Sequence, residues 1–147
     1  MRMPLAGGAM QTLARNQVYP GAIAVDSRDV YWLNTGSQGG DDFCSSSDGT
    51  LMKLAAGTTT AVTLTTQLQG ATDLTVQGGR AYFATWGAYC KYPSSAVGSV
   101  FEYDGALKTR AMDLWEPDHV VVDATTLYFE SVTDLNTRTI VIGALPK

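Results

Sequence analysis

One pattern of residues returns three times along the 147-residue chain. This repetition limits the possible folds more than any other feature, because repeated units of 40 to 50 residues are typical of a few architectures. In each copy a short apolar run is followed, after a turn, by a second run that contains a tyrosine beside an aromatic residue. Tyr31, Tyr82 and Tyr128 are separated by 51 and then 46 residues. The copies cover residues 20–32, 71–83 and 117–129.

Two further elements recur behind this pair of runs. Residues 49–54 match residues 98–103 and, more weakly, residues 138–142. Residues 60–64 match residues 108–112. Each unit therefore contains four short runs, and their Val, Ile, Thr, Tyr and Trp content, bounded by Gly, Asp, Asn and Ser, is typical of β-strands.

The composition supports an all-β chain. Hydrophobic residues make up 45% and charged residues 16%, with 15 glycines, which disfavours disorder and coiled coils. No stretch sustains the spacing of an amphipathic helix. We predict one domain over residues 1–147, with repeats at about 18–67, 68–114 and 115–147. Residues 1–17 are predicted to end a preceding unit or to act as a strand-exchange segment.

The pattern in the first unit resembles YWTD-like and NHL-like β-propeller repeats. Residues 20–26 read Pro-Gly-Ala-Ile-Ala-Val-Asp, residues 30–34 read Val-Tyr-Trp-Leu-Asn, and residues 49–53 read Gly-Thr-Leu-Met-Lys. The likeness is greatest to arrays in secreted or surface proteins of bacteria such as myxobacteria. It implies a β-propeller with about three four-stranded blades in this chain, from a ring of six or seven, and usually a binding role. Some similar propellers are hydrolases or lyases.

Three blades cannot close a ring, and an open arc would leave unpaired strand edges and apolar faces. One explanation is that two copies form a homodimeric six-bladed ring, in which residues 10–13 of one chain lie beside residues 138–142 of the other. The other is that the chain is a fragment whose blades continue in a longer protein. Both explanations stay open at this point.

The longest loops of such a propeller would gather on one face. Residues 35–48 and 86–97 are long insertions at matching points of two units, and the connections between units join them there. Aromatic rings and carboxylates are suited to a carbohydrate or protein ligand. The alternative is that these loops only pack on one another. The predicted ligand-binding residues are Trp86, Tyr89, Tyr92, Trp115, Asp73, Asp118 and His119.

The chain has two cysteines, Cys44 and Cys90, in the matching long loops of neighbouring units. Two thiols 46 residues apart do not form a metal-binding motif. We predict a disulfide between them, which suits a secreted, periplasmic or cell-surface protein. The alternative is two unpaired thiols in the cytosol.

His119 is the single histidine, so any Ser-His-Asp chemistry would have to use it. The alternative enzyme hypothesis is a lyase or hydrolase in which His119 acts with Glu116. A nucleophile elbow, a histidine metal motif and a phosphate-binding glycine loop are absent from the sequence. His119 more simply fills space at the start of a strand. Asp41, Asp42 and Asp48 could bind Ca²⁺, although their spacing is not that of an EF-hand, and we predict no cofactor.

The charge distribution argues against two classes of partner. The net charge is −4 and Lys and Arg form no cluster, so we expect no nucleic-acid binding. The sequence has no apolar run of about 20 residues, so we expect no membrane span, and residues 1–10 do not resemble a signal peptide. The predicted function is a non-enzymatic binding or scaffold module, with a purely structural self-assembling subunit as a further alternative.

Overall fold

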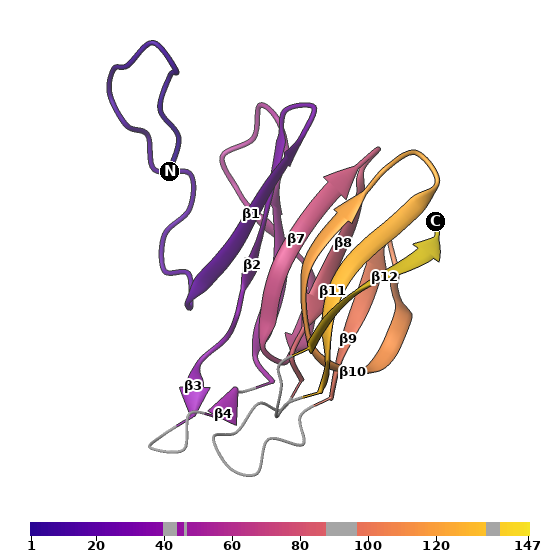
Figure 1. The fold of residues 1–147 in the computed structure, drawn as a ribbon. Helices are drawn as coiled ribbons and strands as arrows, with labels where there is room; N and C mark the ends of the chain where they lie inside the picture. The colour runs from indigo at the N-terminus through magenta and orange to yellow at the C-terminus, as the bar shows by residue number, and fades with distance from the viewer. Residues whose placement is uncertain (40–43, 46, 88–96, 135–138) are drawn as a thin grey trace.

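A computed structural model describes residues 1–39, 44, 45, 47–87, 97–134 and 139–147. Every regular element in these ranges is a β-strand, as the sequence predicts, and none of the described residues is helical. The strands form two main sheets that pack against each other (Figure 1).

The first sheet is an antiparallel meander in the order β1-β2-β5-β6. A two-residue turn joins its first two strands, with Asp26 paired to Asp29 and Ser27 at a positive φ of 55°. Two short strands between β2 and β5 pair only with each other. The bounds are β1 Pro20–Asp26, β2 Asp29–Asn34, β3 Gln38–Gly39, β4 Cys44–Ser45, β5 Gly49–Leu54 and β6 Val62–Leu68.

The second sheet has six strands in the order β12-β11-β10-β9-β8-β7 and curves as a half-barrel (Figure 1). The prediction of three four-stranded propeller blades is therefore wrong. Only the first unit forms a separate four-stranded sheet, whereas the other two share one sheet. The bounds are β7 Ala71–Gln77, β8 Arg80–Thr85, β9 Val97–Tyr103, β10 Leu107–Val122, β11 Thr126–Asp134 and β12 Thr139–Pro146.

The two later units are fused because β10 is a continuous strand of 16 residues. Its first half pairs with β9 and its second half with β11, and Trp115 pairs with both Val97 and Val132. Register shifts on both sides of Trp115 bend the strand without ending it, as β-bulges do. The sheet therefore curves where separate blades would need a break.

The first hydrophobic core lies between the two sheets. Tyr31, Leu33 and Leu51 of the first sheet are buried in one cluster with Leu74 and Phe83 of the second. These residues alternate along their strands with side chains on the other side of the sheet, as the two-residue period requires. Phe83 also stacks on Phe101, with ring centroids 5.4 Å apart.

The second core fills the half-barrel itself. Tyr82, Ala84 and Val100 from β8 and β9 are fully buried in a cluster with Val120 and Leu127 from β10 and β11. The curvature of the six-stranded sheet brings these strands together. The core therefore explains why the two later units stay joined.

Glycine is required where β9 begins. A Cβ added at Gly98 would collide with the carbonyl oxygen of Thr85 and the ring of Pro117. The matching Gly49 at the start of β5 lies against the carbonyl oxygens of Leu68 and Asn34. The glycines that mark the third element of these units therefore allow backbone segments to approach closely.

The apolar run in β1 predicts a strand covered on both faces, and that prediction is wrong. Ile23 is 63% exposed, because it points away from the core on which its neighbours Ala22 and Ala24 pack. Residues 11–17, here called the N-terminal strap, cross the side of the first sheet that faces away from the second sheet. Within the strap, Gln17 Oε1 accepts hydrogen bonds from Trp32 Nε1 at 2.8 Å and from Asn34 Nδ2 at 3.0 Å. The segment between the paired residues Arg2 and Gln11 forms a loop that extends beyond the sheets (Figure 1).

Candidate functional site

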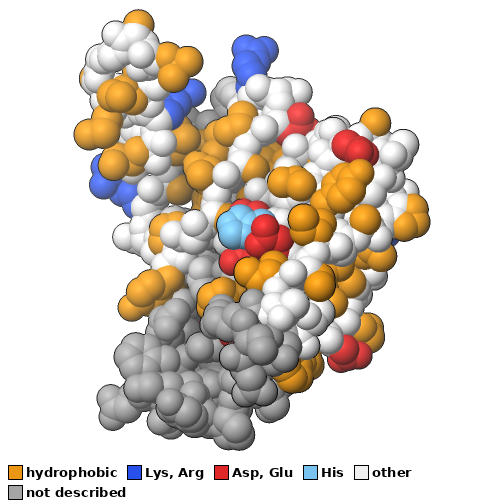
Figure 2. All heavy atoms as spheres, in the orientation of Figure 1, with side chains coloured by type: hydrophobic (Ala, Val, Ile, Leu, Met, Phe, Trp, Pro, Cys, Tyr) orange, Lys and Arg blue, Asp and Glu red, His pale blue; other side chains and the backbone are white. Residues whose placement is uncertain are grey.

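Four of the residues that the sequence singles out line one pocket. It has a volume of about 170 Å³ and lies where residues 116–119 of β10 run beside residues 130–132 of β11, next to the end of β8. Figure 2 shows the imidazole, in pale blue, in the middle of the visible face with carboxylates beside it. The lining residues are Trp86, Glu116, Asp118, His119, Glu130, Ser131, Val132 and Ile140.

The polar side of this pocket is organised by His119. Its Nδ1 lies 3.1 Å from Glu130 Oε2, so the β10 imidazole is held by a β11 carboxylate. The backbone N–H of His119 donates to Asp118 Oδ1 at 3.0 Å. The imidazole side chain is 71% exposed, so it can meet a ligand that arrives from solvent.

Asp73 contributes from the neighbouring strand. Its Oδ2 accepts a 2.7 Å hydrogen bond from the backbone N–H of Val120, which ties β7 to β10. The Thr72 hydroxyl contacts the carbonyl oxygen of Pro117 at 3.4 Å. Asp73 therefore has a structural contact and also places its charge near His119.

These carboxylates raise the pKa of His119 above its usual value. The hydrogen bond with Glu130 is the largest cause, and the negative charges of Asp118, Glu130 and Asp73 act in the same direction. Each favours the protonated imidazolium. The pocket can therefore take up a proton at His119 and lose it as the pH rises.

The backbone around this pocket contains an unusual conformation. Glu116 has a positive φ of 44°. Tyr19 and Gly70, which precede it by 97 and 46 residues, also have positive φ values, of 49° and 64°. That conformation therefore belongs to a turn found in all three units. His119 also has a positive φ of 45°, whereas its counterparts Ala22 and Asp73 do not. The strained position is specific to the third unit, and such strain gathers at functional sites.

Glu130 is the important pocket residue that the sequence reasoning missed. Its counterparts in the earlier units, by the same spacings of 51 and 46 residues, are Leu33 and Ala84. Both are fully buried in a hydrophobic core. A glutamate where two matching positions carry core residues was the signal that could have identified it.

The remaining predicted site residues are separated from this group or lie outside the described residues. Trp115 is 40% exposed and outside the pocket lining, and its carbonyl oxygen accepts a 3.0 Å hydrogen bond from Ser131 Oγ. Tyr89 and Tyr92 lie outside the described residues. The same holds for Cys90, and Cys44 is placed only as part of β4, so the predicted disulfide stays a prediction.

The possible Ca²⁺ ligands are only partly described. Asp41 and Asp42 lie outside the described residues. Asp48 accepts hydrogen bonds from the backbone N–H of Ser37 at 2.8 Å and from its hydroxyl at 2.7 Å. These bonds lower the pKa of Asp48 and give its carboxylate a role in closing the loop. Among the described residues, no three His, Cys, Asp or Glu side chains come together as a metal site.

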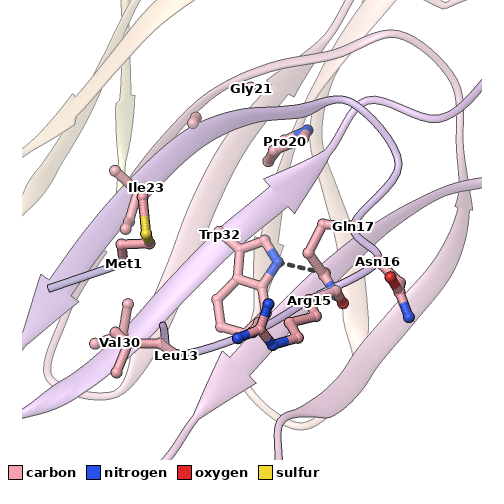
Figure 3. A pocket seen from close by; sticks show the side chains of 12 residues that line it. Met1, Leu13, Arg15, Asn16, Gln17, Pro20, Gly21, Ile23, Val30 and Trp32 are labelled. Atoms are coloured by element: carbon pink, nitrogen blue, oxygen red, sulfur yellow. Dashed lines mark hydrogen bonds between the residues drawn. The ribbon is translucent and has the colours of Figure 1, made fainter. Parts of the chain in front are cut away.

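A second pocket, here called the N-terminal pocket, lies between the strap and the side of the first sheet that faces away from the second sheet. Its volume is about 320 Å³. Ile23, Val30 and Trp32 form the sheet side, and Arg15 and Gln17 belong to the strap side (Figure 3). The Trp32 indole is fixed by its hydrogen bond to Gln17. Sequence reasoning did not predict this pocket.

Comparison with known proteins adds no relative: no family profile matches the chain, and no curated protein is significantly similar to it. In the part of the chain that the structure describes, no helix has the length and apolar character needed to cross a bilayer.

Proposed function

We propose that the chain is a non-enzymatic binding module that recognises a protein ligand through a cationic side chain. The observation that supports this is the His119 pocket, in which Glu116, Asp118 and Glu130 stand beside the side chains of Trp86, Val132 and Ile140. Carboxylates attract a guanidinium or ammonium group, and an adjacent apolar wall suits its methylene stem.

The surrounding charge distribution supports the same ligand class. Residues 111–134 contain six Asp or Glu residues and no Lys or Arg. This local negative field raises the concentration of cationic ligands near the pocket. A basic segment of a protein fits this field better than a neutral carbohydrate does.

The pocket chemistry favours binding over the alternative lyase or hydrolase. His119 is paired with Glu130 and not with Glu116, the partner that the enzyme hypothesis named. The Ser131 hydroxyl donates its hydrogen bond to the Trp115 carbonyl oxygen, so it is engaged away from His119. Secretion or cell-surface exposure stays part of the proposal.

Calorimetric titration with a hexalysine peptide tests the function. The double variant Asp118→Asn/Glu130→Gln should lose about tenfold in affinity or more, as expected when about 1.4 kcal/mol of charged contact is removed. Asp113→Asn is the matched control, because Asp113 lies on the same strand outside the pocket lining. Equal affinity for all three proteins would refute the proposed site.

The variant His119→Ala distinguishes a binding module from an enzyme. A binding module with His119→Ala should still take up the peptide, whereas an enzyme that depends on His119 and Glu116 would lose its turnover. Peptide affinity should also rise from about pH 5 to about pH 8, because deprotonation of His119 removes a positive charge from the pocket.

A further inference from the structure

The outward side of β10, β11 and β12 forms an uncovered surface, here called the C-terminal face. Residues that pair directly across antiparallel strands share one side of a sheet. Val121 pairs with Tyr128, and Glu130 pairs with Ile142. All four therefore lie on this face, and Ile142 is 75% exposed.

The corresponding surfaces of the two earlier units are buried inside the chain. Leu33 pairs with Leu51 in the first sheet, and both are fully buried against the second sheet. Ala84 pairs with Val100 in the same way, and both are fully buried in the half-barrel core. Glu130 paired with Ile142 is the third pair of this series, and it is the uncovered one.

The surfaces that receive these pairs also form a series. The first pair packs in one cluster with Leu74, Ala81 and Phe83. The second packs in one cluster with Val120, Leu127 and Phe129, which follow the first three by 46 residues. Counting back 51 residues from the first three gives Ile23, Val30 and Trp32. These three residues form the sheet side of the N-terminal pocket.

The C-terminal face and the N-terminal pocket also carry side chains of opposite charge. The C-terminal face carries Glu130 where the earlier pairs carry Leu33 and Ala84, so its partner should supply a cation. The N-terminal pocket has Arg15 in its lining. Residues 1–25 contain Arg2 and Arg15 and no acidic residue, whereas residues 111–134 contain six acidic residues and no basic one.

We infer that the C-terminal face of one copy docks on the N-terminal pocket of a second copy, with Ile142 against the exposed Ile23 and Glu130 facing Arg15. The contact would repeat between chains the packing that joins successive units within the chain. This contact goes beyond the proposed function, because it includes an apolar contact between two copies of the chain. The cationic group that Glu130 meets in it is Arg15 of a second copy and not a side chain of another protein.

The two surfaces are different, so the contact is heterologous. A heterologous contact leaves one free surface at each end, and copies are added until a ring closes or a filament grows. Ile142 and Ile23, which are both exposed in a single copy, become covered in this way, and covering exposed apolar side chains removes an aggregation hazard.

Sedimentation velocity of the full chain from about 1 to about 200 μM tests this inference, a range that brackets the micromolar affinities of transient interfaces. The wild type should grow in mass with concentration, and less so at high salt. Ile142→Lys and Ile23→Lys should each be monomeric, because each loses one surface. Val62→Lys is the matched control and should assemble like the wild type. Val62 of β6 is 51% exposed and lies outside both the N-terminal pocket and the C-terminal face.

Mixing the two monomeric variants gives the decisive result. Ile142→Lys keeps an intact N-terminal pocket, and Ile23→Lys keeps an intact C-terminal face. The two variants should therefore form a one-to-one dimer and nothing larger. A wild type that stays monomeric throughout, or either variant pairing with itself, would overturn the inference. Hexalysine binding is measured separately on monomeric Ile23→Lys, in which the His119 pocket is unchanged. The binding result and the assembly result are therefore independent, and either proposal can fail without the other.

Discussion

His119 combines an exposed side chain with a left-handed backbone, and this combination sets what can replace it. Asn tolerates a positive φ, whereas a β-branched residue there is strongly disfavoured. His119→Val should therefore cost about 1 to 2 kcal/mol more stability than His119→Asn. Urea unfolding of the two variants measures the difference. Equal stabilities would mean that the backbone at this residue relaxes without cost.

The protonation of His119 makes stability depend on pH. Its pKa is raised in the folded protein by Glu130 and by the nearby Asp118 and Asp73 charges. A raised pKa contributes stability below the pKa of the unfolded chain, and that contribution disappears as the pH rises through the folded value. NMR titration should place the His119 pKa above 6.5, the usual value of an unperturbed imidazole, and Glu130→Gln should lower it. A His119 pKa that Glu130→Gln leaves unchanged would contradict this account.

At the scale of elements, a buried charge holds four strands together. Glu102 of β9 is 2% exposed. It pairs with Arg80 of β8 at 3.4 Å and with Arg110 of β10. Arg110 also donates to the carbonyl oxygen of Pro146 in β12. The network therefore links β12, the edge strand at one end of the half-barrel, with β8, β9 and β10.

Removing one partner leaves the buried charge incompletely paired. Arg110→Met should destabilise the protein by about 3 kcal/mol in chemical denaturation. Lys108→Met is the control on the same strand, because its partner Asp104 forms a surface ion pair and the cost should stay below about 1 kcal/mol. A similar loss from both variants would show that the Glu102 network contributes no more than a surface pair.

The elements also show how far sequence reasoning extends. The strands and tight turns follow from local residue types, as at Asp26 and Asp29, and the spacing of Tyr31, Tyr82 and Tyr128 locates equivalent strands. The sequence could not predict that β10 continues through Trp115 and joins the second and third units. The strand continues there because Trp115 pairs with both β9 and β11, and these pairings depend on residues far away in the sequence. Glu130 was missed because a single glutamate within an apolar strand belongs to no recognised sequence motif.

For the molecule as a whole, the strap completes the first sheet. Trp32 is 6% exposed because residues of the strap cover it, and Gln17 holds its indole. Deleting residues 1–10, which are exposed, should leave the free energy of unfolding almost unchanged. Deleting residues 1–17 should lower it by about 1 to 3 kcal/mol and shift tryptophan emission to longer wavelengths.

The second deletion tests the strap directly. Gln17→Ala is its point-mutation counterpart, since it removes the hydrogen bonds to Trp32 and Asn34 and keeps the chain length. It should account for part of the loss. If the longer deletion and the shorter one unfold alike, the strap does not stabilise the first sheet.

The order of the strands bears on how the protein is made. In both main sheets each strand pairs with the next main strand along the chain, and the pair β3 and β4 closes on itself. As the polypeptide leaves the ribosome, every strand after the first of its sheet therefore finds a partner already synthesised. Synthesis runs from the N-terminus at about 5 to 20 residues per second, whereas hairpins form within about 1 to 10 μs. The first sheet can thus be complete before β7 emerges, and it then serves as a template on which the half-barrel is built during translation.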